Sequence, residues 1–216
     1  MKLYLSSYKL GNYTEELVKW RKEQGSKIAL IPDAKDCFPD GDRKETGIAA
    51  DAKALENLGF EVTVIKLKNY FNDHEQLRRE LNNFKAFFVT GGDAFVLRQA
   101  MMLSGFDLFL KEISKKDNYY YAGYSAGICV LAPNMKGLEL VDGSLNSPYG
   151  TDFIMEGLAI VDYVPVPHFE SDHPESPAIN EVVKYLKSQN IKYRALRDGD
   201  VIIEDTLQQE NQKELA

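Results

Sequence analysis

The sequence predicts one α/β domain built on a mostly parallel β-sheet with helices on its faces. Three observations support this fold class. Apolar, strand-like runs alternate along the chain with segments whose apolar residues recur at helical spacing. Two of those runs, residues 85–90 and the run that begins at Tyr119, end directly in glycine-rich turns. The length of 216 residues suits a single domain with a sizeable core.

The first half of the chain alternates five expected strands with helices. The strands are short apolar runs at residues 3–5, 27–32, 61–67, 85–90 and 119–124. Each expected helix shows one apolar face: Tyr13, Leu17 and Trp20; Ile48, Ala52 and Leu55; Leu77, Leu81 and Phe84; and Phe106, Phe109, Leu110 and Ile113. Such alternation implies right-handed crossovers and a parallel sheet, whose sites form beyond the carboxyl ends of its strands.

The second half is less regular. We expect strands at residues 139–141 and 158–166, joined by a loop at 143–150, and then a helix that Ser176 caps. Residues 194–196 and 201–204 are expected to form a final pair of strands with Asp198-Gly199 as their turn. With no linker or repeat in the sequence, the predicted domain covers residues 1–206, and residues 207–216 form a polar tail that frays.

Composition excludes several classes of partner. The net charge of −7 argues against a nucleic-acid surface and against binding to anionic membranes. No apolar run approaches a membrane span, and the first residues lack the apolar core of a signal peptide. Two cysteines, Cys37 and Cys129, make no disulfide framework, so we expect a reducing, cytoplasmic compartment. No metal-ligand spacing or phosphate-loop motif occurs, so neither metal nor cofactor is expected. The expected assembly is a monomer or homodimer.

The sequence Gly123-Tyr124-Ser125-Ala126-Gly127 follows a buried strand and precedes a helix. A serine at so sharp a turn has a strained backbone, and its hydroxyl is exposed above the sheet. Side chains at Gly123 or Gly127 would collide across the turn. The pattern predicts that Ser125 is a nucleophile at a nucleophile elbow, although a plain glycine-rich turn has the same pattern.

A serine nucleophile needs a base, and that base is usually histidine. His168 directly follows an apolar strand, at the sheet edge where Ser125 is expected, and is the predicted base. The other two histidines, His74 and His173, lie in segments expected to be exposed. A carboxylate should orient the imidazole. Both Asp142 and Glu139 lie between the serine and the histidine, and we favour Asp142 because it follows the end of an expected strand.

Acyl transfer also needs donors for the developing oxyanion. One is the N–H of Ala126, directly after the serine. The other is expected in the Gly91-Gly92-Asp93 turn, where Gly92 lets the backbone approach a substrate. Asp93 would bring a negative charge close to the substrate. A turn that uses glycine only for its shape remains the alternative.

Three blocks of sequence resemble one family. Thr-Gly-Gly-Asp-Ala-Phe (90–95), Gly-Tyr-Ser-Ala-Gly (123–127) and Pro-Val-Pro-His-Phe (165–169) stand in the order of the dipeptidase E and cyanophycinase family of serine peptidases. The resemblance implies a fold like that of class I glutamine amidotransferases, with serine in place of their cysteine. It implies Ser125 as nucleophile, His168 as base, and oxyanion donors at Gly92 and Ala126.

The chain departs from the family pattern at two places. The glycine turn of the family usually continues into asparagine, and here it continues into Asp93. No arginine follows His168 before Arg194, so the aspartyl preference of dipeptidase E proper is not expected. The predicted function is hydrolysis of small peptides through an acyl-enzyme. The alternatives are an esterase or amidohydrolase that acts on other acyl groups, and a non-catalytic domain that binds a metabolite.

Overall fold

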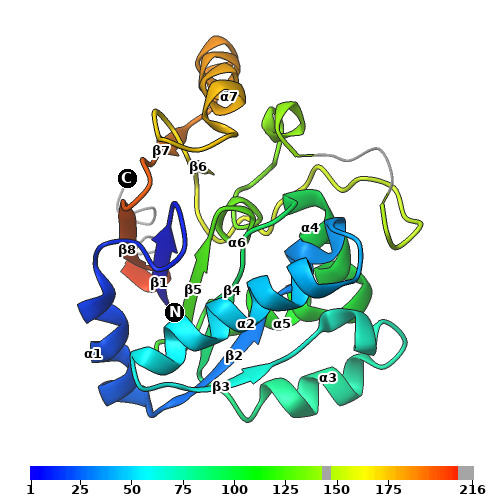
Figure 1. The fold of residues 1–216 in the computed structure, drawn as a ribbon, viewed down its shortest axis with the longest axis vertical. Helices are drawn as coiled ribbons and strands as arrows, with labels where there is room; N and C mark the ends of the chain where they lie inside the picture. The colour runs from blue at the N-terminus through cyan, green and yellow to red at the C-terminus, as the bar shows by residue number, and fades with distance from the viewer. Residues whose placement is uncertain (143–146, 209–216) are drawn as a thin grey trace.

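The computed structural model describes residues 1–142 and 147–208. Its main sheet has six strands in the order β3-β2-β4-β5-β1-β8. They are β1 (Lys2–Ser6), β2 (Lys27–Ile31), β3 (Glu61–Val64), β4 (Ala86–Val89), β5 (Tyr120–Tyr124) and β8 (Val201–Asp205). All neighbours pair in parallel except β1 and β8, which are antiparallel. The predicted parallel α/β sheet is therefore confirmed, and each of its five parallel strands overlaps one of the five predicted runs (Figure 1).

Helices cover the two faces of this sheet. They are α1 (Thr14–Gln24), α2 (Asp42–Asn57), α3 (His74–Leu81), α4 (Ala94–Ser104), α5 (Phe106–Ile113) and the short α6 (Ala126–Cys129). Three short 3₁₀ helices add to them: η1 (Asp33–Cys37), η2 (Leu67–Tyr70) and η3 (Leu138–Leu140). In strand β4, Phe88 packs with residues of α1 and α2, whereas Phe87 packs with residues of α4 and α5. Because the strands are covered on both faces, they read as unbroken apolar runs.

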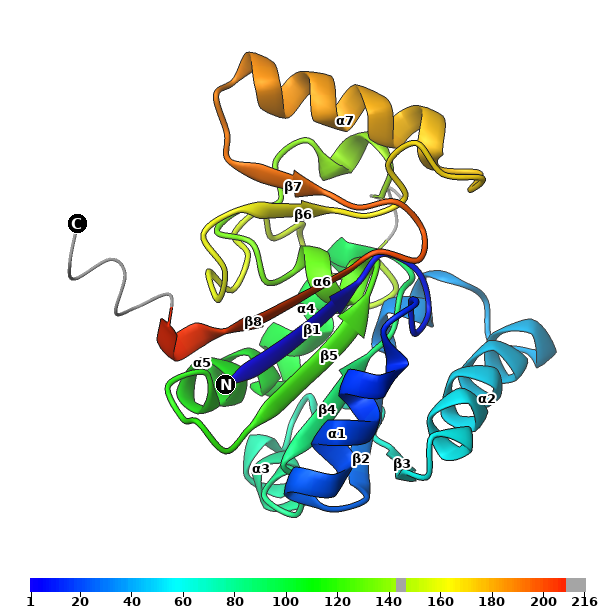
Figure 2. The same ribbon diagram turned by 90° about the vertical axis from the view of Figure 1, so that its left-hand side faces the viewer.

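A smaller unit stands beside the main sheet. Strand β6 (Val164–Val166) pairs in parallel with β7 (Tyr193–Ala195), and helix α7 (Ser176–Ser188) connects them. Figure 2 shows β6 and β7 between α7 and the main sheet. The chain then returns to the main sheet through residues 196–200 and enters β8. This return brings the end of β6 to the edge where the parallel strands end.

Three expected elements differ from the structure. Residues 139–141 do not form a strand, because η3 occupies this place. Of the run 158–166, only β6 is a strand. The N–H groups of Leu158 and Ile160 instead donate to carbonyls of Val130 and Leu131, just beyond α6. An apolar run that covers a helix end is buried like a strand, so the sequence pattern does not separate the two.

The predicted final hairpin is also wrong. Asp198-Gly199 does lie in a turn, but β7 pairs with β6 while β8 pairs with β1. The two strands therefore belong to different sheets, and the turn bridges them. Of the predicted tail, Leu207 and Gln208 are helical and residues 209–216 lie outside the described part of the chain, as do residues 143–146 of the predicted loop. Within the described ranges, no helix is long and apolar enough to cross a membrane.

Candidate active site

Ser125 lies at the turn between β5 and α6. Its backbone has φ 49° and ψ −119°, a combination that costs free energy for a residue with a side chain. The fold holds this turn tightly. A Cβ on Gly127 would lie 2.3 Å from the carbonyl oxygen of Val89 in β4, and a Cβ on Gly91 would lie 3.0 Å from the Cβ of Ser125. The two glycine turns are therefore neighbours, as the sequence predicted, and glycine is required at both contacts.

Gly92 makes a second close approach. Its φ is +148°, and a Cβ there would lie 2.1 Å from the carbonyl oxygen of Ala34 in η1. Any larger residue would push this turn away from η1. Within residues 1–142 and 147–208, neither the Gly92 N–H nor the Ala126 N–H donates a hydrogen bond to a protein acceptor. Gly92 lines the cleft described below, and Ala126 directly follows Ser125, so both groups lie beside the Ser125 turn.

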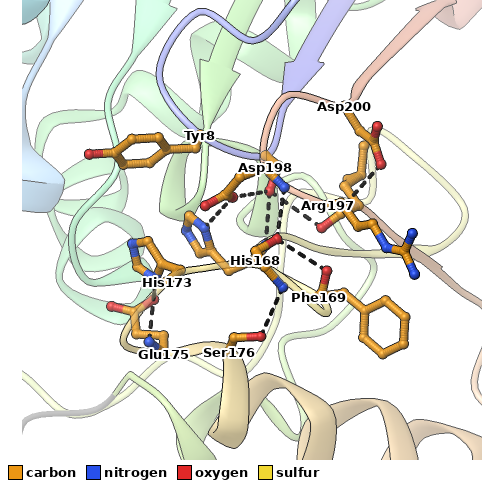
Figure 3. A network of polar contacts seen from close by, with 12 residues as sticks. Tyr8, His168, Phe169, His173, Glu175, Ser176, Arg197, Asp198 and Asp200 are labelled. Carbon is orange, nitrogen blue, oxygen red and sulfur yellow. Dashed lines mark hydrogen bonds and ion pairs between the residues drawn. The ribbon is translucent and has the colours of Figure 1, made fainter.

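His168 follows β6 and is buried, with 1% of its surface exposed. Its Nδ1 lies 2.7 Å from Oδ1 of Asp198 (Figure 3). Burial lowers the pKa of the imidazole, and Asp198 opposes that effect. The ring is therefore neutral near pH 7, with the proton on Nδ1 toward the carboxylate and the lone pair on Nε2. A neutral imidazole held in this way is suited to accept a proton.

Ser7, directly after β1, contacts all three of these residues. Its carbonyl oxygen accepts a hydrogen bond from the Ser125 N–H at 3.2 Å. Its hydroxyl accepts from the His168 N–H at 2.8 Å and donates to Oδ1 of Asp198 at 2.9 Å. The backbone of His168 has φ 60°, so the hydrogen bond from its N–H supports a strained conformation. One fully buried residue thus connects β5, the end of β6 and the segment 196–200.

The structure corrects the prediction that Asp142 orients the histidine. Asp198 holds the Nδ1 of His168, while Oδ2 of Asp142 accepts a hydrogen bond from the Ala94 N–H at 2.9 Å. The alternative, Glu139, is exposed and accepts from the Gly137 N–H at 2.6 Å. The prediction failed because it depended on a strand at 139–141 that does not form.

Asp93 and Asp142 together occupy the N-terminus of α4. Oδ1 of Asp93 accepts hydrogen bonds from the N–H groups of Phe95 and Val96, at 2.8 and 2.9 Å. Asp93 therefore caps the helix, a use of its carboxylate that the sequence analysis did not foresee. Burial, together with the charge of Asp93, raises the pKa of Asp142 to about 8, although the Ala94 N–H opposes the rise.

A cleft of about 890 Å³ lies over these groups. Ser125, Gly92, Asp93, Asp142, Glu139 and His168 all line it. Its walls also carry two sets of charge. The basic side chains are Lys9, Lys35, Arg43 and Lys44, and the acidic ones are Asp93, Glu139, Asp142 and Glu175. Such a cleft is suited to a small ligand that bears groups of both signs.

Lys35 is a buried member of the basic set, and it links two other side chains. Its Nζ donates to the hydroxyl of Tyr124 at 3.0 Å and pairs with the carboxylate of Asp51 at 3.2 Å. Burial lowers the pKa of this lysine, and Asp51 opposes that shift. Because Tyr124 directly precedes Ser125, the network fixes the strand end that carries the serine. Nothing in the local sequence marks Lys35, Ser7 or Asp198 as site residues, since only pairing between distant segments brings them here.

Comparisons with known proteins agree with this architecture. A family model described as peptidase family S51 matches residues 4–209. A search of curated proteins gives no match. Among solved structures, one similar chain is a protein of Listeria monocytogenes EGD-e provisionally assigned to peptidase E. It has a TM-score of 0.69 and 23% identity, over 94% of this chain and 98% of that one. A peptidase from an acI-B1 Actinobacterium has a TM-score of 0.62 and 15% identity, over 94% and 82%.

Proposed function

Because the chain belongs to peptidase family S51, we propose that Ser125, His168 and Asp198 form its catalytic triad. The protein is a serine peptidase of the dipeptidase E type, as its sequence blocks implied. The observation that carries the triad is the 2.7 Å contact between Nδ1 of His168 and Asp198, at the cleft that Ser125 lines. The positive φ of Ser125 supports its role as the nucleophile of a nucleophile elbow.

The reaction follows from the protonation state of His168. Its Nε2 takes the proton of the Ser125 hydroxyl as Oγ attacks the substrate carbonyl. Asp198 keeps the ring oriented and stabilises the imidazolium that forms. The imidazolium then donates its proton to the leaving amine, and an acyl-enzyme remains on Oγ. A water molecule, deprotonated by the same nitrogen, hydrolyses this ester and regenerates Ser125.

The negative oxygen of each tetrahedral intermediate needs donors close to it. We assign this role to the N–H groups of Gly92 and Ala126, which flank the Ser125 turn. Preorganised donors of this kind lower the barrier because they are in place before charge develops. The close contact between Gly92 and η1 supports this assignment, since it fixes the position of the glycine turn.

The charged walls of the cleft support a small peptide as substrate. A dipeptide carries both an ammonium and a carboxylate, and side chains of both signs line the cleft. Asp93 at one wall favours the ammonium, whereas Lys9 and Arg43 favour the carboxylate. The two cysteines are free, which supports the predicted cytoplasmic compartment.

The test is the substitution Ser125→Ala with a panel of dipeptides. The rate of hydrolysis should fall by several orders of magnitude while the fold is kept, because the remaining groups of the site supply only a small part of the rate enhancement without the nucleophile. The control is Ser188→Ala, whose hydroxyl, within the part of the chain that the structure describes, contacts only the Tyr185 carbonyl of its own helix and the side chain of Gln189. A fluorophosphonate should label the wild type at Ser125 and leave the alanine variant unlabelled. Full hydrolysis by Ser125→Ala would refute the assignment, and turnover of simple esters without peptides would favour the esterase alternative.

A further inference from the structure

Three metal-ligating side chains gather beside the proposed base. Among the described residues, His168, His173 and Glu175 place one donor atom each within 4.8 Å of the other two. The rings of His168 and His173 are stacked, with centroids 3.8 Å apart and planes inclined by 9°. Figure 3 shows His173 and Glu175 on the loop that follows His168, between β6 and α7.

The donor set suits a zinc ion. Two imidazoles and one carboxylate are the protein ligands of a common open zinc site, in which a fourth position is left for water. A zinc-bound histidine also donates its other ring N–H to a carboxylate, which fixes its orientation. Asp198 makes this contact with Nδ1 of His168 at 2.7 Å. The structure therefore supplies the ligands and also the carboxylate behind one of them.

The three residues differ in how firmly they are held. Asp198 and Ser7 fix His168, whose side chain is 2% exposed. The side chains of His173 and Glu175 are 19% and 42% exposed. Donors of a tetrahedral zinc lie about 3.3–3.4 Å apart, given bonds of about 2.0–2.1 Å. To reach these separations, His173 and Glu175 therefore move toward His168, and the ring of His173 turns out of the stack.

We propose that His168, His173 and Glu175 bind Zn²⁺ and that the bound ion inhibits hydrolysis. The metal takes the Nε2 lone pair of His168, because Nδ1 already contacts Asp198. The imidazole then has no site for the Ser125 proton, so the serine is not activated. Zinc binding is independent of the proposed function, whereas its inhibitory effect rests on that function.

Calorimetric titration of untagged, chelator-treated protein with ZnCl₂ tests the site. We expect one ion per chain, and an affinity at least tenfold weaker in His173→Gln and in Glu175→Gln. The matched control is His74→Gln, because His74 lies outside the cleft and contacts the Leu103 carbonyl. Its affinity should equal that of the wild type. A wild type that binds no Zn²⁺, or His173→Gln and Glu175→Gln variants that bind as tightly as it does, would overturn the site.

Hydrolysis tests the second half of the proposal. Zn²⁺ should inhibit the wild type, and excess chelator should restore the rate. For His173→Gln, the zinc concentration for half-inhibition should rise at least tenfold, measured against the variant's own zinc-free rate. Unchanged hydrolysis at saturating Zn²⁺ would overturn inhibition while leaving the site intact. Ser125→Ala should bind Zn²⁺ like the wild type, so a failure of the triad assignment remains distinguishable from a failure of this site.

Discussion

Substitution of Ser7 by alanine removes a single hydroxyl that links two members of the proposed triad. That hydroxyl accepts from the His168 N–H at 2.8 Å and donates to Asp198 at 2.9 Å. The carbonyl of Ser7, which holds the Ser125 N–H, is part of the backbone and remains. The change therefore affects the base and its carboxylate, whereas the nucleophile turn keeps its contact.

The expected cost follows from the two lost hydrogen bonds. A buried N–H left without an acceptor costs about 1–3 kcal/mol, and a hydrogen bond to a charged group is worth about 1.5–3 kcal/mol. Together they predict that the free energy of unfolding falls by about 2.5–6 kcal/mol. If about 1.4–2.7 kcal/mol of this loss also applies to the transition state, kcat falls about 10- to 100-fold. The Michaelis constant should change less, because Ser7 does not line the cleft.

Steady-state kinetics and denaturant unfolding of three variants separate positioning from stability. Ser7→Thr keeps the hydroxyl but adds a methyl group at a fully buried site, so it should lose stability while retaining most of kcat. Ser6→Ala is the matched control, because that hydroxyl is equally buried and, among the described residues, donates only to the Tyr8 carbonyl. Full kcat in Ser7→Ala, or an equal loss of kcat in Ser6→Ala, would refute the reasoning.

Three further predictions concern the carboxylates and the glycine turn. Asp198→Asn should lower kcat about 10³- to 10⁴-fold, as expected for an orienting carboxylate, whereas Asp142→Asn should lose far less; equal losses in a peptidase assay would contradict the assignment. The pKa of Asp142 is raised from 3.8 to about 8 in the folded protein, so the folded state favours the protonated carboxyl. The stability that Asp142 contributes to the fold is therefore fully present below about pH 3.8 and is lost as pH rises through about 8. The melting temperature of Asp142→Asn minus that of the wild type should therefore be larger at pH 9 than at pH 5. A difference that does not change with pH would disprove the shift. In urea unfolding, Gly92→Ala should lose about 1–3 kcal/mol more of the free energy of unfolding than Gly25→Ala. Both glycines have positive φ, but only a Cβ on Gly92 would meet Ala34. Equal losses in the two variants would show that the contact with Ala34 relaxes.

The parts of the site that depend on neighbouring residues in the chain could be predicted from sequence. The Ser125 turn is such a part, because an apolar strand, two glycines and the following helix specify it within a dozen residues. The closeness of the Gly91-Gly92 turn to Ser125 also followed, since the carboxyl ends of parallel strands share one edge. His168 could be placed because an apolar run precedes it, even though only the last three residues of that run form a strand.

The parts that depend on long-range pairing could not be predicted. Asp198 reaches the site because β8 pairs with β1, which aligns Val201 with Ser6. A turn between two apolar runs is typical of a hairpin, and nothing local shows that the runs join different sheets. Ser7 has no signature at all, because a serine after a strand is common. Its partners, His168 and Asp198, lie 161 and 191 positions further along the chain.

The position of Asp198 between two sheets has a consequence for how the molecule matures. Strand β8 is near the end of the described chain, and its docking beside β1 is what carries the carboxylate to the imidazole. During synthesis, a nascent chain that lacks residues 201–205 already contains Ser125, His168 and the Ser7 that contacts both, but it has no β8 to hold Asp198 beside the imidazole. The proposed triad is therefore complete only once β8 is paired with β1.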